Sequence, residues 1–331
     1  MSTAFPFLRL PDKASKLVIQ CMEYTEIVGF SLASNKTKEI VRSLNLHMER
    51  IDLAVNNIIT VRLDSKEGSP SSMVWSFYPQ EDSPGPIPVY MPSRVTGMIT
   101  ERSFVEYQNP GLSIQKWIEH FQYIFSIEEI NYLSFADETC KFDWISLKDT
   151  FGKFKILTIF FHDVCSLECA QMALRHFPSA RNLTPFNSNF NDPNLYSNIL
   201  IQNWDLLVLG VEVFMSLRIG LDDLLLMNSK DITVQSPTVT DKMVNQFFKH
   251  WIRGSNPRME LARFVFVNGQ VVNKEIVLKG LQYQVVLMDP IEGEGEEEVE
   301  GYDIRRNDGT VGTISIEQTD QGCDVYFQIF E

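Results

Sequence analysis

The chain has 331 residues, of which 44% are hydrophobic and 22% are charged, and its formal net charge is -14. This length predicts one large domain or two to three smaller ones, with ample apolar material for a core. The acidic balance argues against bulk nucleic-acid binding and against an anionic membrane surface, because phosphate groups would repel the chain.

The cysteines and the apolar segments predict an intracellular protein. The five cysteines are an odd number scattered along the chain, which is typical of free thiols in a reducing compartment. No apolar stretch approaches the roughly 20 residues that span a bilayer. Residues 1–10 hold no signal-peptide core with a cleavage site. We therefore expect a protein of the cytoplasm, the nucleus or both.

Residues 1–47 are predicted to form three short helices. Thr25 is expected to cap the second helix and Ser34 the third. The segment has more apolar side chains than three short helices can hide, and about 40 residues is too few for a self-sufficient core. It therefore packs on the rest of the chain or offers an apolar face to a partner. The apolar stripe of the first helix comprises Ala14, Leu17, Val18, Cys21 and Met22.

Residues 48–111 are predicted to form a β-hairpin followed by an irregular connector. Ile58–Leu63 and Met73–Tyr78 are strand-like, and the turn-rich segment Asp64–Ser72 joins them. Prolines then recur from Pro79 to Pro92, which is typical of a segment without regular structure.

Residues 112–285 are predicted to alternate between helix and strand. The first three strands are spaced by about 25 residues, inside the range of leucine-rich repeats, whose units stack into a parallel sheet with helices outside. The consensus Asn is absent and the later spacing drifts, so we expect an irregular leucine-rich-repeat-like array. The predicted helices are Ile114–Phe125, Leu147–Phe151, Cys165–Phe177 and Val239–Trp251, and the strands are Ile130–Phe135, Ile156–Phe161, Arg181–Phe186, Val213–Ile219, Ile232–Gln235 and Leu261–Val267.

Residues 286–331 are predicted to hold an acidic loop and a small antiparallel β meander. The Glu-rich run Glu292–Glu300 favours a solvated loop. Asn307-Asp308-Gly309 has hairpin-turn chemistry, because these residues tolerate positive φ. The predicted fold class is a mixed α+β and α/β protein. Its C-terminal strands are Tyr302–Arg306, Val311–Glu317 and Val325–Phe330.

One pattern resembles a catalytic site and another resembles a zinc site, but a structural role is favoured for both. Ser31 lies in a loose nucleophile-elbow pattern, but that elbow needs a strand, a sharp turn and a helix, whereas Ser31 is predicted to be helical. The candidate zinc ligands share one helical face, but the outer pair would be about 21 Å apart. Two of them could share a zinc with distant partners; core thiols are favoured. These candidates are His162, Cys165, Cys169 and His176.

The remaining polar motifs also favour structural roles. Asp222-Asp223 and the Glu run lack the ligand spacing of a calcium loop. Gly293-x-Gly295 lacks the lysine of a phosphate-binding loop. Trp251–Pro257 is either a substrate loop or a helix end, and its complete cap chemistry favours the helix end. We therefore predict no catalytic residue, metal or cofactor, and no enzymatic activity.

The N-terminal segment resembles an F-box. The marks are the Leu-Pro start and the serine-bearing turn before a basic third helix. The residues that match are Phe5–Pro11, Leu17–Ile19, Cys21-Met22, Ile27, Phe30–Ser34 and Lys36.

A second, sharper resemblance is to the type-2 F-box-associated domain of the large nematode F-box family. The two resemblances occur in the expected order and together extend over most of the chain. The segments that match are Leu221–Ser229, Asn245–Ile252, Gly254–Arg258, Lys279-Gly280, Tyr302–Arg306 and Asp308-Gly309.

The resemblance implies a substrate-recognition adaptor of an SCF-type (Skp–cullin–F-box) ubiquitin ligase. Residues 1–47 would dock on the Skp-type subunit, and the C-terminal region would hold a protein substrate, for which the acidic surface favours basic partners. Two alternatives stay open: an F-box-derived interaction module that assembles no ligase, or an unrecognised enzyme. The docking candidates, some of which must instead face the core, are Leu10, Pro11, Val18, Met22, Ile27, Phe30 and Leu32.

Overall fold

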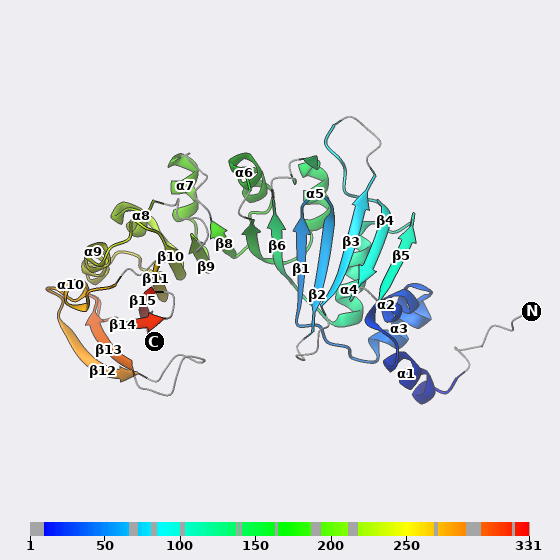
Figure 1. The fold of residues 1–331 in the computed structure, drawn as a ribbon, viewed down its shortest axis with the longest axis horizontal. Helices are drawn as coiled ribbons and strands as arrows, with labels where there is room; N and C mark the ends of the chain where they lie inside the picture. Colours follow the sequence, from blue (N-terminus) through cyan, green and yellow to red (C-terminus); the bar gives the residue numbers. More distant parts are fainter. Residues whose placement is uncertain are drawn as a thin grey trace, which may run out of the picture. The chain divides into compact units, whose positions relative to one another are not determined.

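The computed structural model divides the chain into two compact units (Figure 1). Unit 1 comprises Met1–Thr158 and Met172–Ala180, and unit 2 comprises Ile159–Gln171 and Arg181–Glu331. The structure describes residues 10–65, 72–80, 85–99, 103–136, 139, 141–162, 165–186, 193–210, 218–267, 271–288, 299–319 and 322–330. Among these residues, no helix is both long and apolar enough to cross a bilayer.

Three N-terminal helices open unit 1, as predicted. Ser34 caps the third helix by accepting a hydrogen bond from the Thr37 N–H. The second helix is capped differently from the prediction, because Glu23 rather than Thr25 is its N-cap residue, in a reciprocal capping box with Glu26. The helices are α1 (Asp12–Gln20), α2 (Tyr24–Leu32) and α3 (Asn35–Arg42).

A mixed sheet follows, in which six strands of unit 1 lie in the order β6-β1-β2-β3-β4-β5. Neighbouring strands are antiparallel except β1 and β6, which are parallel. The predicted hairpin is present as β2 and β3, but the expected connector was wrong in part, since β4 begins at Pro92. Proline is tolerated as the first residue of a strand. The strands are β1 (Arg50–Val55), β2 (Ile59–Asp64), β3 (Met73–Pro79), β4 (Pro92–Met98), β5 (Phe104–Gln108) and β6 (Ile130–Phe135).

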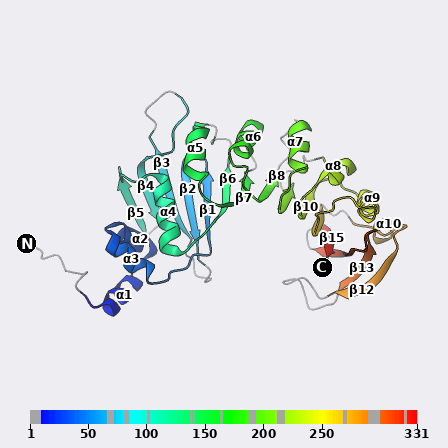
Figure 2. The ribbon, with the colours of Figure 1, turned by 180° about the vertical axis from the view of Figure 1, so that it is seen from behind.

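Helices α4 (Ile114–Phe125) and α5 (Trp144–Phe151) cover one face of this sheet (Figure 2). Burial alternates along β1, β2 and β3, so that every second side chain points into the core. The largest core side chains come from the sheet and from α4, where the Trp75 ring lies 5.4 Å from the rings of both Trp117 and Phe121.

Unit 2 alternates helices with four parallel strands, β8-β9-β10-β11. The alternation was predicted, although α7, β9 and α8 were not. Most of the expected strand Val213–Ile219 lies outside the described residues. The likeness to leucine-rich repeats stays a prediction. The elements are β7 (Ile156–Phe161) and α6 (Leu167–His176), where the units divide, then β8 (Asn182–Phe186), α7 (Pro193–Leu200), β9 (Leu206–Leu209), α8 (Leu221–Leu226), β10 (Asp231–Gln235), α9 (Asp241–Ile252) and β11 (Leu261–Val267).

Antiparallel strands complete the sheet of unit 2 in the order β11-β15-β14-β13-β12. Strand β12 was not predicted, and the expected acidic loop ends earlier than 300, because β13 begins at Val299. Residues 291–298 of that loop lie outside the described residues. The elements are α10 (Lys274–Val277), β12 (Tyr283–Met288), β13 (Val299–Arg305), β14 (Val311–Thr319) and β15 (Gly322–Ile329).

Candidate functional site

Apolar side chains of α1 are exposed to solvent, beside the exposed polar residues Asp12, Lys13 and Gln20. Leu17 is 64% exposed and Val18 is 43% exposed, and Pro11 at the start of the helix is exposed as well. The buried residues of α1 are Ser15 and Ile19, one turn apart. Leu17 and Val18 of the predicted apolar stripe are thus exposed, and Ile19, outside that stripe, is the apolar residue of α1 that is buried. We call Pro11, Leu17 and Val18 the α1 face.

The other predicted docking residues lie closer to the interior. Ile27 is only 3% exposed and belongs to the core, so its side chain is not available to a partner. Leu17 was missing from the predicted docking set, although it precedes Val18 directly. The exposure of Leu17 could not be read from apolar spacing alone, because several apolar residues of α1 compete for the buried positions. The half-buried members are Leu10, Met22, Phe30 and Leu32.

Helices α2 and α3 are held on α4 and on the start of β5 by polar contacts. The Ser31 hydroxyl lies 2.6 Å from Nε2 of His120, and the Thr25 hydroxyl lies 3.0 Å from that of Ser103. From α4, the Tyr123 hydroxyl donates to the Glu39 carboxylate at 2.8 Å. These contacts attach α2 and α3 to the rest of unit 1, and Nζ of Lys16 donates from α1 to the Ser43 carbonyl at the end of α3.

The Ser31–His120 pair is not arranged as a nucleophile and its base. The Ser31 hydroxyl donates its one proton to the Val28 carbonyl at 2.7 Å, so His120 must donate through Nε2 to Ser31. A base would instead accept the serine proton. Burial lowers the pKa of His120 to about 4 and keeps the ring neutral. Ser31 is also buried inside α2, where no substrate reaches it.

The four residues weighed as zinc ligands have other surroundings. Cys165 and Cys169 are buried thiols. Nδ1 of His176 lies 2.8 Å from the Met172 carbonyl of its own helix, and its ring stacks on Trp144. Within the described part of the chain, no three His, Cys, Asp or Glu side chains are grouped so as to hold a metal ion.

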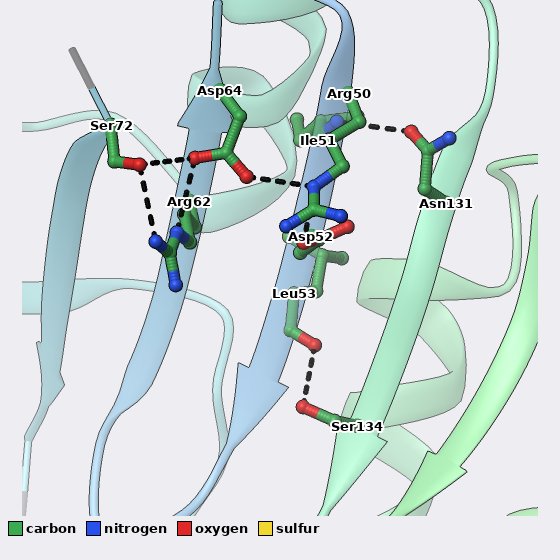
Figure 3. Close-up of polar contacts among 9 residues, drawn as sticks. All are labelled: Arg50, Ile51, Asp52, Leu53, Arg62, Asp64, Ser72, Asn131 and Ser134. Atoms are coloured by element: carbon green, nitrogen blue, oxygen red, sulfur yellow. Dashed lines mark hydrogen bonds and ion pairs between the residues drawn. The ribbon is translucent and has the colours of Figure 1, made fainter. Parts of the chain in front are cut away.

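A compact charged cluster lies on β1 and β2 (Figure 3). Nε of Arg50 lies 2.7 Å from Asp64 and 3.2 Å from Asp52, and Nε of Arg62 lies 3.1 Å from Asp64. The Ser72 hydroxyl donates to Asp64 as well. Two arginines and two aspartates neutralise one another here, so the cluster serves strand pairing rather than ligand binding.

Two asparagines in the segments of the second resemblance each donate to two backbone carbonyls. Nδ2 of Asn256 donates to the Leu224 carbonyl at 2.9 Å and to the Met227 carbonyl at 2.8 Å, which joins the loop after α9 to α8. Nδ2 of Asn245 donates to the Val277 and Lys279 carbonyls. Both asparagines are buried. The motif residues thus build a scaffold around α9.

The end of α9 supports the structural interpretation of the segment 251–257. Gly254 has a φ of +108°, which favours glycine, and its N–H donates to the Trp251 carbonyl at 2.9 Å. The guanidinium of Arg306 lies 5.3 Å from the centre of a Trp251 ring, and the Asn307 N–H donates to the Ile252 carbonyl. The turn between β13 and β14 is thereby packed against the end of α9.

A cleft of about 810 Å³ opens beside this scaffold. Its lining mixes charged and apolar groups, and a Lys230–Glu260 ion pair of 3.1 Å lies in the wall. Such a mixed cleft suits a peptide segment better than a small apolar ligand. The lining residues that belong to the matching segments are Pro257, Arg258, Arg306 and Gly309.

The comparisons with known proteins agree with both resemblances. Residues 7–49 match the F-box domain family, and residues 195–264 match the family described as F-box associated. The F-box associated domain-containing protein sdz-33 of Caenorhabditis elegans is 23% identical over 314 residues, an alignment that covers 94% of this chain and 93% of that protein. No solved structure matches this chain. The predicted similarity to nematode F-box proteins is confirmed.

Proposed function

We propose that this chain is a substrate-recognition adaptor of an SCF-type ubiquitin ligase. Helices α1 to α3 bind the Skp-type subunit, and unit 2 holds a protein substrate. The observation that carries the proposal is the α1 face, where Leu17 and Val18 are exposed inside the segment that matches the F-box family. Apolar side chains exposed next to each other favour a protein partner, since burying them removes apolar surface from water.

The adaptor accelerates ubiquitin transfer by holding the substrate near the ligase. Its own residues perform no chemistry; tethering raises the effective concentration of substrate lysines at the ubiquitin-conjugating enzyme. A firmly attached docking segment favours this role, because a mobile one would reduce the effective concentration. The contacts of Ser31, Tyr123 and Thr25 attach α2 and α3 in this way.

The docking set proposed on this basis combines the α1 face with the half-buried candidates. It omits Ile27, which is in the core. It adds Leu17, which is more exposed to solvent than Val18. We further propose that the chain functions in four segments, residues 1–47, 48–111, 112–285 and 286–331. A ubiquitin-ligase role places the protein in the cytoplasm, the nucleus or both.

A pulldown with the purified Skp-type subunit tests the proposal. The wild-type chain is expected to bind, and a Leu17→Asp, Val18→Asp double variant is expected to lose binding, because a charge buried in an apolar interface stays unpaired. A Leu10→Ala, Pro11→Ala variant tests the start of α1.

The matched control is Ile145→Asp on α5. Ile145 is 64% exposed, as is Leu17, so this substitution repeats the Leu17→Asp half of the double variant outside the docking segment. Far-UV circular dichroism checks that every variant is folded. Absence of binding by a folded wild-type chain would favour the alternative of an F-box-derived module that assembles no ligase.

A further inference from the structure

Strand β12 is an edge strand without the usual protection. The sheet order of unit 2 ends at β12, and in the described residues its outer side pairs with no strand. Unpaired N–H and C=O groups along such an edge are a template for another strand. Natural edges are usually interrupted by charges, prolines or bulges. Tyr283–Met288 contains no charged residue and no proline, and its pairing with β13 runs without a bulge.

One face of β12 is also apolar and exposed. Alternate residues of a strand point to the same side of the sheet, so Tyr283, Val285 and Leu287 form one row. Val285 is 60% exposed and Leu287 is 69% exposed, and Tyr283 is exposed too. Three exposed apolar side chains in one row are unusual next to an open edge. We call this row, with the outer backbone of β12, the β12 edge.

The opposite edge strand, in unit 1, is protected. Strand β5 contains Glu106, a charge on the strand itself, and it contacts α2. A Cβ added at Gly29 of α2 would lie 2.7 Å from the Tyr107 hydroxyl of β5, which shows how closely the two elements approach. In the described residues, β5 thus has a charged residue and a neighbouring helix at its edge, whereas β12 contains no charged residue.

Strand β12 is paired along its whole inner side, so its outer backbone is already ordered for a further strand. The six residues of β12 pair in continuous register with β13, from Tyr283 opposite Ile304 to Met288 opposite Val299. The Tyr283 ring meets the buried Tyr302 ring edge-on at a centroid distance of 5.4 Å. A pre-ordered strand lowers the entropic cost of adding another strand.

The charge of the sequence around β12 determines which kind of partner strand can bind there. Residues 281–304 contain no lysine or arginine, and Asp289 and a Glu-rich run follow β12 in the sequence. Arg305 lies near the start of β12, beside Tyr283 and Gln284, so the acidic sequence is concentrated after the other end of the strand. A second copy of the chain would bring the same acidic sequence to the edge and add a further net charge of -14. A partner with basic residues is attracted instead.

We propose that the β12 edge binds an extended segment of a partner protein as an added strand. Alternate apolar side chains of that segment lie over Tyr283, Val285 and Leu287, and lysines or arginines flank them. The proposal rests on the proposed function, because it names the class of protein segment that unit 2 holds. Main-chain hydrogen bonds supply most of the affinity, and the apolar row with the acidic surroundings supplies the selectivity.

The test uses a phage-displayed library of random twelve-residue peptides, selected against the full-length chain. Selected peptides are expected to alternate apolar residues between basic flanks. In fluorescence anisotropy, their affinity is expected to fall at least about tenfold for the Val285→Lys variant. The matched control is Ile201→Lys, at an apolar residue of unit 2 that is 51% exposed and outside β12.

N-methylation of the peptide identifies strand addition itself. Methylating successive peptide nitrogens should abolish binding at every second position, because only alternate N–H groups face the β12 edge. Equal binding to the Val285→Lys variant, or tolerance of N-methylation at every position, would overturn the proposal. A wild-type dimer in light scattering that Val285→Lys abolishes would also overturn it, in favour of a second copy.

Failure here and failure of the adaptor role can be told apart. Peptide binding is measured without any ligase component, and docking to the Skp-type subunit is measured without any peptide. Docking without peptide binding at β12 leaves the adaptor proposal intact and removes the β12 proposal. Peptide binding without docking removes the adaptor proposal and leaves strand addition at β12 intact.

Discussion

At the residue scale, close packing explains why a glycine, Gly29, lies inside α2. Glycine inside a helix costs about 1 kcal/mol relative to alanine. A Cβ at this position would lie 2.7 Å from the Tyr107 hydroxyl oxygen. The Tyr107 ring is itself restrained, since its centroid lies 6.4 Å from that of Trp75 and 5.6 Å from that of Trp117. The close approach of α2 and β5 therefore offsets the poor helix propensity.

Gly29→Ala is expected to leave the free energy of unfolding nearly unchanged in the wild-type background. The gain in helix propensity is opposed by the contact with Tyr107. In a Tyr107→Phe background the same substitution should stabilise by about 1 kcal/mol, because the hydroxyl is gone. Urea unfolding of the four proteins measures both changes. The same stabilisation in the two backgrounds would contradict the packing explanation.

Asp231, at the start of β10, makes folding stability depend on pH. Burial, with a smaller contribution from the nearby Glu260 carboxylate, raises the pKa of Asp231 to about 6 from its ordinary value of 3.8. Between these values the folded chain binds more protons at this site than the unfolded chain does. The contribution of Asp231 to stability therefore increases as the pH falls from about 6 to about 4.

Asp231→Asn is expected to raise the melting temperature at pH 7.5, because the variant buries no charge. Below pH 4 the neutral aspartic acid and the asparagine should give similar melting temperatures. Differential scanning fluorimetry from pH 3.5 to 7.5 measures the difference. A difference that stays constant over this range would rule out titration of Asp231 as its cause.

At the element scale, side chains join helices that the chain separates widely. Asn256 ties the loop after α9 to α8 through two backbone carbonyls. It also has a φ of +50°, which most residues other than glycine adopt only at a cost. This one residue therefore combines a turn conformation with a connection between two helices, which explains its place in the matching motif.

Asn256→Ala is expected to lower the free energy of unfolding by about 2 to 4 kcal/mol, since two buried carbonyls lose their donor. Asn256→Gly also removes the donor but suits the positive φ, so it should be less destabilising than alanine by about 1 kcal/mol. Chemical denaturation compares the two variants. Losses below about 0.5 kcal/mol in both would contradict the proposed connection.

His120 joins α4 to α2 and makes that contact sensitive to acid. Burial, together with the charge of Lys38, lowers the pKa of His120 to about 4, whereas an unfolded histidine titrates near 6.5. Between these values the unfolded chain binds more protons at this site, so stability falls as the pH decreases from about 6.5 to about 4.

His120→Gln is expected to remove this part of the pH dependence, because glutamine can still donate to Ser31 and does not titrate. Urea unfolding at pH 7.5 and at pH 5.0 should show a larger loss of stability for the wild type than for the variant. The Asp231→Asn variant should retain the loss. Equal losses in the wild type and in His120→Gln would refute the role of His120.

At the scale of the whole molecule, the proposed function needs two separate surfaces, the α1 face in unit 1 and a substrate surface in unit 2. A chain held in an active ligase also presents its own lysines to the ubiquitin-conjugating enzyme at high effective concentration. Modification of the adaptor itself therefore reports assembly without knowledge of a substrate.

In a reconstituted ligase with the Skp-type subunit, the chain is expected to become ubiquitinated. The Leu17→Asp, Val18→Asp variant should lose this modification, and Ile145→Asp and Val285→Lys should retain it. Immunoblotting of the reaction measures the outcome. Docking of the wild type on the Skp-type subunit without any modification would favour the F-box-derived module over the ligase adaptor.

The sequence by itself determined the three N-terminal helices, most of the alternating helices and strands, and the two family resemblances. These features depend on local periodicity, caps and motif spacing, which can be recognised in a single amino-acid sequence. Strands β1, β4, β5, β9 and β12 were not predicted. β4 begins within a proline-rich segment and β9 has only four residues, whereas the alternation of polar and apolar residues along β1 was overlooked. Their pairing depends on partners distant in sequence.

Only the tertiary structure decided which apolar residues face outward. Leu17 and Ile27 are equally apolar in sequence, yet Leu17 is exposed and Ile27 is buried. Burial is a property of neighbours brought together from elsewhere in the chain. For the same reason the open edge at β12 could not be predicted: whether a strand is central or at an edge depends on the order of strands in the sheet, which local sequence does not encode.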